Sequence, residues 1–206
     1  MNHLFKLVTR WITTFSLPFA ILILLFPKKI MLIFGSQFLQ GYPILMILVS
    51  AAFIQAVFGI GGTTLNMTGF PKMNLLNTFI ACGLNIGLNL YLIPTMGGMG
   101  AATATLITLS FIAFIRIIQN WKLLQLTPWS PKLVKPIFAG ILAFAAGNYL
   151  KEFIMPFHTI LTLISGGIII VFVFFTTLWL LGLDEDDYGL MEGLQVILRN
   201  IKSKSP

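Results

Sequence analysis

The stretch from residue 73 to residue 115 contains no charged side chain over 43 consecutive positions. Ordinary soluble domains carry about 25% charged residues, so an uncharged stretch of this length is not expected at a protein–water surface. A helix that crosses a bilayer needs about 20 mainly apolar residues, and this stretch is long enough for two. We therefore expect two membrane crossings, joined by a tight turn that contains Pro94, Gly97, Gly98 and Gly100.

The rest of the chain has the same character, since 57% of its residues are hydrophobic and only 9% are charged. Only helices and closed barrels satisfy their backbone hydrogen bonds inside lipid, and the apolar runs here do not alternate with polar residues as barrel strands do. The sequence predicts an all-α, polytopic membrane protein. Its residues 1–183 are expected to form one lobe, and residues 184–206 a charged tail. Six spans are predicted at residues 11–27, 43–68, 73–93, 99–118, 133–150 and 157–181.

Three segments fall outside these expected spans. Residues 1–10 are interpreted as a short polar lead, and residues 119–135 as a polar connection between two spans. Residues 30–41 are too few to cross a bilayer and are expected to lie at its interface or to dip partway into it.

The positive charges predict how the chain is oriented. Six spans place both termini on one side, together with ten cations, and leave Lys28, Lys29 and Lys151 on the other. Cytoplasmic loops carry an excess of Lys and Arg, so we expect a cell (cytoplasmic) membrane protein with both termini in the cytoplasm. The ten cations are Lys6, Arg10, Lys72, Arg116, Lys122, Lys132, Lys135, Arg199, Lys202 and Lys204.

The sequence holds no pattern typical of an enzyme or a metal site. His3 and His158 stand alone, without a second ligand at metal-binding spacing. The single cysteine, Cys82, lies within an expected span, where a packing role is typical. The scattered cations form no basic stripe that would follow nucleic-acid phosphates. We expect no enzymatic activity, no cofactor, no metal and no nucleic-acid partner.

Amide side chains inside the expected spans are the best candidates for function. Such groups are costly in hydrocarbon and are expected to face protein or a wet cavity. Two interpretations stay open: hydrogen bonds between helices, or the wall of a polar passage that accepts sugar hydroxyls or phosphate. A Gly83-xxx-Gly87 pair on a neighbouring face would permit close approach of another helix. The substrate-cavity candidates are Gln55, Asn66, Asn77, Asn85 and Asn89.

A series of short motifs connects the central stretch to a known family. The motif residues are Leu65, Asn66 and Gly69, then Asn85, Ile86, Leu88, Asn89, Leu92, Ile93 and Pro94, then Gly97, Gly100, Ala101, Ala102, Ala104 and Thr105. This pattern resembles the C-terminal half of polysaccharide biosynthesis flippases in the multidrug/oligosaccharidyl-lipid/polysaccharide exporter superfamily. The segment from Leu25 to Gly35 is similar to the first helix of that half, and the resemblance covers residues 4–120.

The resemblance implies transport by alternating access, in which two helical lobes form a cavity that opens to each side in turn. A lipid-linked oligosaccharide or polysaccharide precursor would pass its polar head through the cavity while its tail stays in lipid. This chain would be the C-terminal lobe, surrounded by membrane lipids and paired with a complementary N-terminal lobe or another copy of itself. Arg116 and Lys72 are interpreted as loop-end residues that set topology.

Two other functions stay open from the sequence. One is a lobe of a multidrug, cation-coupled exporter, which is disfavoured because no acidic residue precedes Glu152. The other is a non-transporting, truncated membrane scaffold.

Overall fold

The computed structural model describes residues 1–154 and 158–182 of the chain, and these residues form helices and no strands. Six helical stretches in this part are long and apolar enough to cross a membrane. The all-α, polytopic architecture expected from the sequence is confirmed. The predicted charged tail, residues 184–206, lies outside the described residues.

The helices follow one another with short connections. In chain order they are α1 (Asn2–Leu25), α2 (Pro27–Phe34), the 3₁₀ turn η1 (Ser36–Gly41), α3 (Tyr42–Phe58), α4 (Ile60–Met67), α5 (Pro71–Met96), α6 (Gly98–Leu124), the 3₁₀ turn η2 (Pro131–Leu133), α7 (Val134–Ile154) and α8 (Thr159–Leu180).

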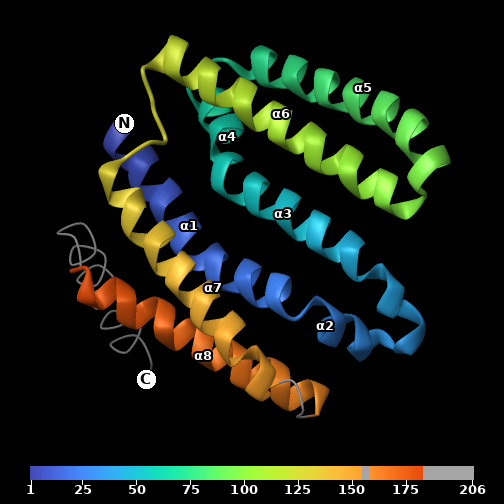
Figure 1. Ribbon diagram of the computed structural model, residues 1–206. Helices are drawn as coiled ribbons and strands as arrows, with labels where there is room; N and C mark the ends of the chain where they lie inside the picture. The colour runs from blue at the N-terminus through green and yellow to red at the C-terminus, as the bar shows by residue number, and fades with distance from the viewer. Residues whose placement is uncertain (155–157, 183–206) are drawn as a thin grey trace, which may run out of the picture.

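The long helices lie side by side in an order that differs from the chain order (Figure 1). Helix α5 packs on α6, α6 packs on α3, and α3 packs on α1, which in turn contacts both α7 and α8. The N-terminus lies near the end of α6 and the start of α7 (Figure 1). The lobe therefore has an α1–α7–α8 side and an α3–α5–α6 side, joined by the contact between α1 and α3.

The tightest core lies among α1, α7 and α8, where small residues let the helices approach closely. The rings of Phe26 and Phe174 are almost fully buried, at 1% and 0% exposure. Gly166 of α8 lies against Phe26, because a Cβ atom built there would come within 2.7 Å of the ring. The other core residues are Ile21, Leu25, Ala139, Ala143 and Ile170.

The first helix begins before the first predicted span. Helix α1 starts at Asn2, so the expected polar lead of residues 1–10 is helical. The hydroxyl of Thr9 donates to the Phe5 carbonyl, and that of Thr13 donates to the Thr9 carbonyl, each at 2.8 Å. Polar side chains that bond to their own helix do not end it, which is why the segment stays helical.

The expected polar connection at residues 119–135 is also partly helical. Helix α6 continues to Leu124 and includes Gln119 and Asn120. Both amides have partners on neighbouring helices, so their polarity does not require exposure to water. Residues 30–41 form the end of α2 and η1, at the opposite end of the bundle from the N-terminus (Figure 1).

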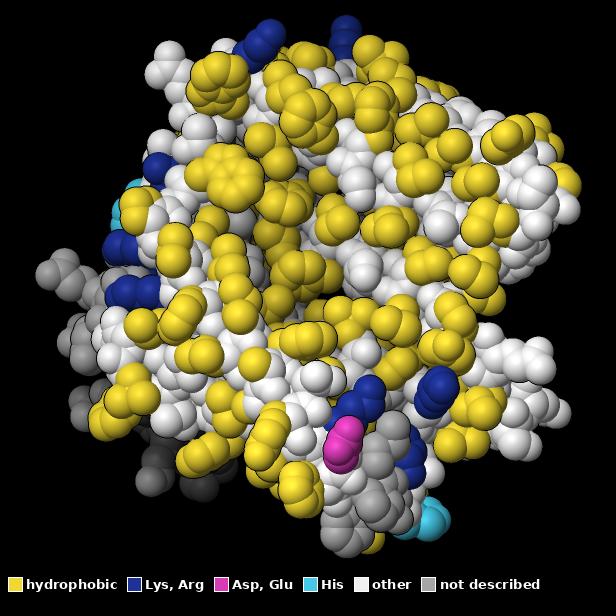
Figure 2. Space-filling view, in the orientation of Figure 1, with side chains coloured by type: hydrophobic (Ala, Val, Ile, Leu, Met, Phe, Trp, Pro, Cys, Tyr) yellow, Lys and Arg dark blue, Asp and Glu magenta, His cyan; other side chains and the backbone are white. Residues whose placement is uncertain are grey.

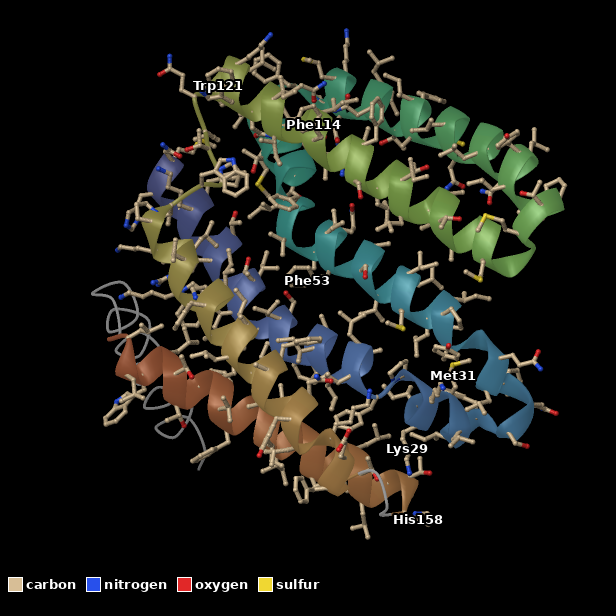
Figure 3. All side chains as sticks on the ribbon, viewed as in Figure 1. Lys29, Met31, Phe53, Phe114, Trp121 and His158 are labelled. Carbon is tan, nitrogen blue, oxygen red and sulfur yellow. The ribbon has the colours of Figure 1, made fainter. Side chains whose placement is uncertain are left out.

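Apolar side chains are spread over the face of the lobe that Figure 2 shows. Phe79, Leu90 and Phe172 are exposed by 67%, 74% and 69%, as expected for side chains that face lipid. Trp121 lies at one end of the bundle, and Lys29 and His158 lie at the opposite end (Figure 3). The Gly83 and Gly87 positions on α5 are open, because no atom lies within 4 Å of the place that a Cβ would take, so no described helix of this chain uses the pair.

Candidate functional site

The amide of Asn77 lies inside the contact between α5 and α6. Its Nδ2 donates to Oε1 of Gln119 at 2.6 Å, and Nε2 of Gln119 donates back to Oδ1 of Asn77 at 2.9 Å. Asn77 is 1% exposed. This predicted site residue therefore joins two spans through a reciprocal amide pair.

Two further predicted residues continue along the same helix contact. Nδ2 of Asn85 points to the hydroxyl of Thr108 on α6, at 3.4 Å. Nδ2 of Asn89 donates to Oδ1 of Asn85 at 2.8 Å, one turn along α5. Oδ1 of Asn89 is buried and has no hydrogen-bond partner. The Asn77, Asn85 and Asn89 side chains thus form an amide row between α5 and α6, which ends in an unused acceptor.

The remaining two predicted residues lie apart from this row. Asn66, near the end of α4, is exposed, and its Oδ1 accepts a hydrogen bond from Nδ2 of Asn74 at 3.1 Å. Gln55 lies one turn before the break between α3 and α4 at Gly59, and its Oε1 is buried without a partner. The structure therefore brings three of the five residues together and leaves two elsewhere.

Arg116, which the sequence suggests is a loop-end cation, lies within helix α6 and contacts α4. Arg116 is eight residues before the end of α6, and its guanidinium lies over Gly62 of α4. A Cβ atom at Gly62 would come within 2.9 Å of Arg116 Cζ and within 3.1 Å of Asn74 Oδ1. Helix α6 extends beyond the end expected for this span, so Arg116 lies within the helix and not in the connection that follows it.

Asn120 holds this part of α6 against α4. Its Nδ2 donates to the carbonyls of Gly61 at 3.1 Å and Arg116 at 2.7 Å, and the residue is fully buried. The sequence does contain a signal for this contact, namely the four-residue spacing of Arg116 and Asn120. That spacing places both side chains on one face of a helix, provided that the helix continues past residue 118. We call Gly61, Gly62, Asn74, Arg116 and Asn120 the polar junction.

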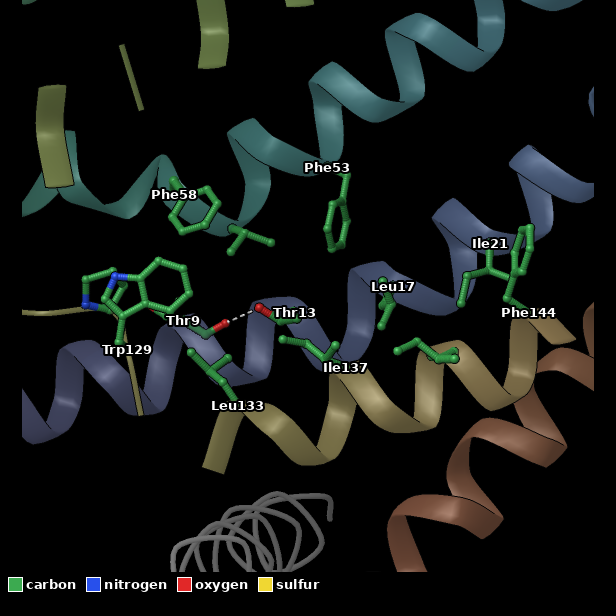
Figure 4. A pocket seen from close by; sticks show the side chains of 14 residues that line it. Thr9, Thr13, Leu17, Ile21, Phe53, Phe58, Trp129, Leu133, Ile137 and Phe144 are labelled. Carbon is green, nitrogen blue, oxygen red and sulfur yellow. Dashed lines mark hydrogen bonds between the residues drawn. The ribbon is translucent and has the colours of Figure 1, made fainter. Parts of the chain in front are cut away.

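A separate cavity of about 490 Å³ lies between α1, α3 and α7 (Figure 4), within the hollow at the centre of the front face in Figure 2. Its two hydroxyl groups, on Thr9 and Thr13, already donate to carbonyls of their own helix. None of the five predicted residues lines it. The lining residues are Thr9, Thr13, Leu17, Ile21, Phe53, Val57, Phe58, Pro128, Trp129, Leu133, Ile137, Gly140, Ile141 and Phe144.

Metal-binding clusters are absent from the described residues: no group of three or more His, Cys, Asp or Glu side chains comes together there. Among these residues the only acidic side chain is that of Glu152, in the last turn of α7. The chemistry open to this part of the chain is therefore hydrogen bonding by amides and attraction by cations.

The comparisons with known proteins agree with the membrane architecture. An uncharacterized membrane protein from Methanocaldococcus jannaschii is 31% identical to this chain over 157 residues. The chain is a multi-pass membrane protein. The aligned residues make up 74% of this chain but only 30% of the relative, so the matched part spans less than a third of that longer protein. No protein-family model matches the chain, and no solved structure matches it.

Proposed function

We propose that this chain is one lobe of a membrane transporter that flips lipid-linked oligosaccharide or polysaccharide precursors across the cytoplasmic membrane by alternating access. Both termini would lie in the cytoplasm. The substrate would cross without being chemically changed, so the chain would not act as an enzyme. The resemblance of residues 4–120 to polysaccharide flippases supports this choice of substrate.

The observation that carries the proposal is a set of unused acceptors inside an otherwise apolar lobe. The amide oxygens of Gln55, Asn74 and Asn89 are buried and have no hydrogen-bond partner. A buried polar group without a partner is costly, and more so in a membrane protein, where the alternative environment is hydrocarbon. Saccharides carry many hydroxyl donors, so a passing sugar head is a ligand that such acceptors would bind.

A single lobe needs a partner to enclose a polar passage. Helix α5 contacts α4 and α6 and leaves most of its surface exposed, including the open Gly83 and Gly87 positions. The M. jannaschii relative is long enough to contain a second lobe, because the matched region is 30% of its length. We propose that a complementary lobe, or another copy of this chain, covers the α5 side.

Deletion of the gene tests the transport itself. In the native cells, loss of the chain should make lipid-linked saccharides accumulate in the cytoplasmic leaflet, measured by their resistance to an external glycosidase in sealed vesicles. Sequencing the DNA upstream of Met1 should identify the complementary lobe if one exists. The proposal fails if the deletion strain translocates its lipid-linked saccharides at the normal rate.

The amide row then provides a sharper test. The Asn85→Leu/Asn89→Leu variant removes the acceptor at Asn89 together with its neighbour, and we expect slower translocation at equal protein level. Thr78→Val is a matched control on α5, since Thr78 is exposed and its hydroxyl donates only to the carbonyl of Asn74. Equal translocation by both variants would mean that the row serves helix packing alone.

A further inference from the structure

Arg116 is half-buried, and its guanidinium lies against α4. Its Nε atom is buried and has no hydrogen-bond partner. The side chain lies over Gly62, where the missing Cβ leaves room for the guanidinium plane. A cation within a span is costly unless an anion or hydrogen-bond acceptors compensate it. An anionic ligand beside Arg116 would therefore be favourable.

The helices around Arg116 cannot supply the anion. The chain has six acidic residues, and the first of them is Glu152, so α1 to α6 contain no carboxylate. Glu152 is exposed and lies in the last turn of α7. Arg116 lies in the last third of α6, and α6 ends near the start of α7 (Figure 1). The compensating charge must come from outside these helices.

The depth of Arg116 indicates which anion is available. It is eight residues, or about 12 Å, from the end of α6. A helix of 27 residues is about 40 Å long and exceeds a hydrocarbon core of about 30 Å by a few ångströms at each end. A long arginine side chain at this depth reaches the headgroup boundary. The anionic group that a bilayer presents there is phosphate.

The neighbours of Arg116 suit such a ligand. Arginine offers a planar fork of donors that matches phosphate oxygens in pairs. Asn120 fixes the turn that carries Arg116 by bonding to the Arg116 and Gly61 carbonyls. Asn74 lies in the first turn of α5, whose positive end also favours an anion. The positive charge of Arg116 therefore lies beside the open space over Gly62, and the free donors there are those of Arg116, because the Asn120 and Asn74 amide nitrogens already donate to other groups.

We propose that the polar junction binds a phosphate group carried by a lipid, with Arg116 as the phosphate-binding residue and Asn120 as its positioning residue. The phosphate belongs either to a bilayer phospholipid or to a polyprenyl phosphate that carries saccharide. This binding site goes beyond the proposed transport, because phosphate binding requires no movement of the ligand across the membrane.

Lipid binding to the purified full chain tests the proposal. The chain in maltoside detergent micelles, which contain no phosphate, is titrated with phosphatidylglycerol in one arm and with polyprenyl phosphate in the other, and bound lipid is measured by native mass spectrometry. Arg116→Gln should weaken binding about tenfold, the loss expected for a hydrogen bond to a charged group. Lys122→Gln removes an exposed cation from the same helix and should leave binding unchanged.

Arg116→Lys keeps the charge but loses the planar fork, and we expect several-fold weaker binding than in the wild type. If Arg116→Gln does not fold, the binding of Arg116→Lys tests the site in its place. Binding of phosphatidylglycerol identifies a bilayer headgroup as the ligand, and binding of polyprenyl phosphate alone identifies the saccharide carrier. Absence of binding in both arms, or equal binding by the wild type and both Arg116 variants, overturns the site. Neither result depends on whether the chain transports anything.

Discussion

Asn77 and Gln119 are 42 positions apart in the chain, yet their amides exchange two hydrogen bonds, at 2.6 and 2.9 Å, between adjacent spans. In each amide, the NH2 group donates one of these hydrogen bonds and the carbonyl oxygen accepts the other. In hydrocarbon, a polar pair of this kind specifies which helix packs against which, because any other register would leave both amides without partners.

A double-mutant cycle measures the strength of this pair. We expect Asn77→Leu and Gln119→Leu each to lower the free energy of unfolding, and the double variant to lose less than the sum of the two. Coupling in membrane proteins averages about 0.6 kcal/mol and reaches about 1.7 kcal/mol. The measurement is reversible unfolding in mixed micelles as the denaturing detergent increases. Strictly additive losses would show that the two amides do not interact.

Two adjacent glycines on α8 should respond differently to the same substitution. In Gly166→Ala the new Cβ meets the buried Phe26 ring at 2.7 Å, and overpacking of this kind costs about 1–3 kcal/mol. In Gly167→Ala the nearest atom is a methyl carbon of Leu22 at 3.6 Å, an ordinary contact. We expect the first variant to unfold at a lower detergent fraction and the second to match the wild type. The reverse order would contradict the packing of α8 on α1.

The turn between α5 and α6 gives a second pair of matched variants. A Cβ at Gly100 would clash with the backbone oxygen of Leu92, which cannot move aside as a flexible side chain can. Gly87 on α5 has open space around it. Gly100→Ala should therefore destabilise the α5–α6 pair by at least about 1–3 kcal/mol, whereas Gly87→Ala should be neutral or slightly stabilising. Thermal unfolding of both variants in one detergent provides the comparison.

Cys82 reports on what covers α5. It is the only cysteine of the chain and is exposed near the middle of α5. Maleimides react with the thiolate, which forms only where water reaches the sulfur. In open membrane fragments, where a membrane-impermeant maleimide reaches both sides, we expect the reagent not to label Cys82, and full labelling to follow denaturation in detergent.

A Trp121→Cys variant in a Cys82→Ser background is the positive control, since Trp121 is 58% exposed at the end of the bundle. Rapid labelling of Cys82 without detergent would show that this face of α5 borders water. That result would indicate that any aqueous passage is lined by the outer face of α5 and not by the amide row.

Sequence patterns predicted the elements better than their ends. Each of the six predicted spans corresponds to a helical stretch that is long and apolar enough to cross a membrane, because a run of about 20 apolar residues favours a helix in a bilayer. Helices α1 and α6 extend beyond the predicted spans, through polar residues such as Thr9 and Asn120 that are typical of segments in water. Those groups are satisfied by carbonyls of their own or a neighbouring helix, and partners of that kind are not visible in composition.

For the candidate site too, the sequence predicted features within one helix but not the contacts between helices. Helical spacing correctly placed Asn77, Asn85 and Asn89 on one face of α5, since that depends only on the geometry of a single helix. It could not show that Gln119 and Thr108 would face them, or that Gln55 and Asn66 would lie elsewhere.

Hydropathy along the chain was sufficient to establish an all-α membrane protein, because the need to satisfy backbone hydrogen bonds in lipid acts on each segment locally. The position of Arg116 could be learned only from the packed helices. Its place over Gly62 depends on how α4, α5 and α6 pack. Its charge has no carboxylate partner on these helices, because α1 to α6 contain no acidic residue. Whether a cation is a loop-end charge or a binding group is set by its neighbours in space, which local sequence does not specify.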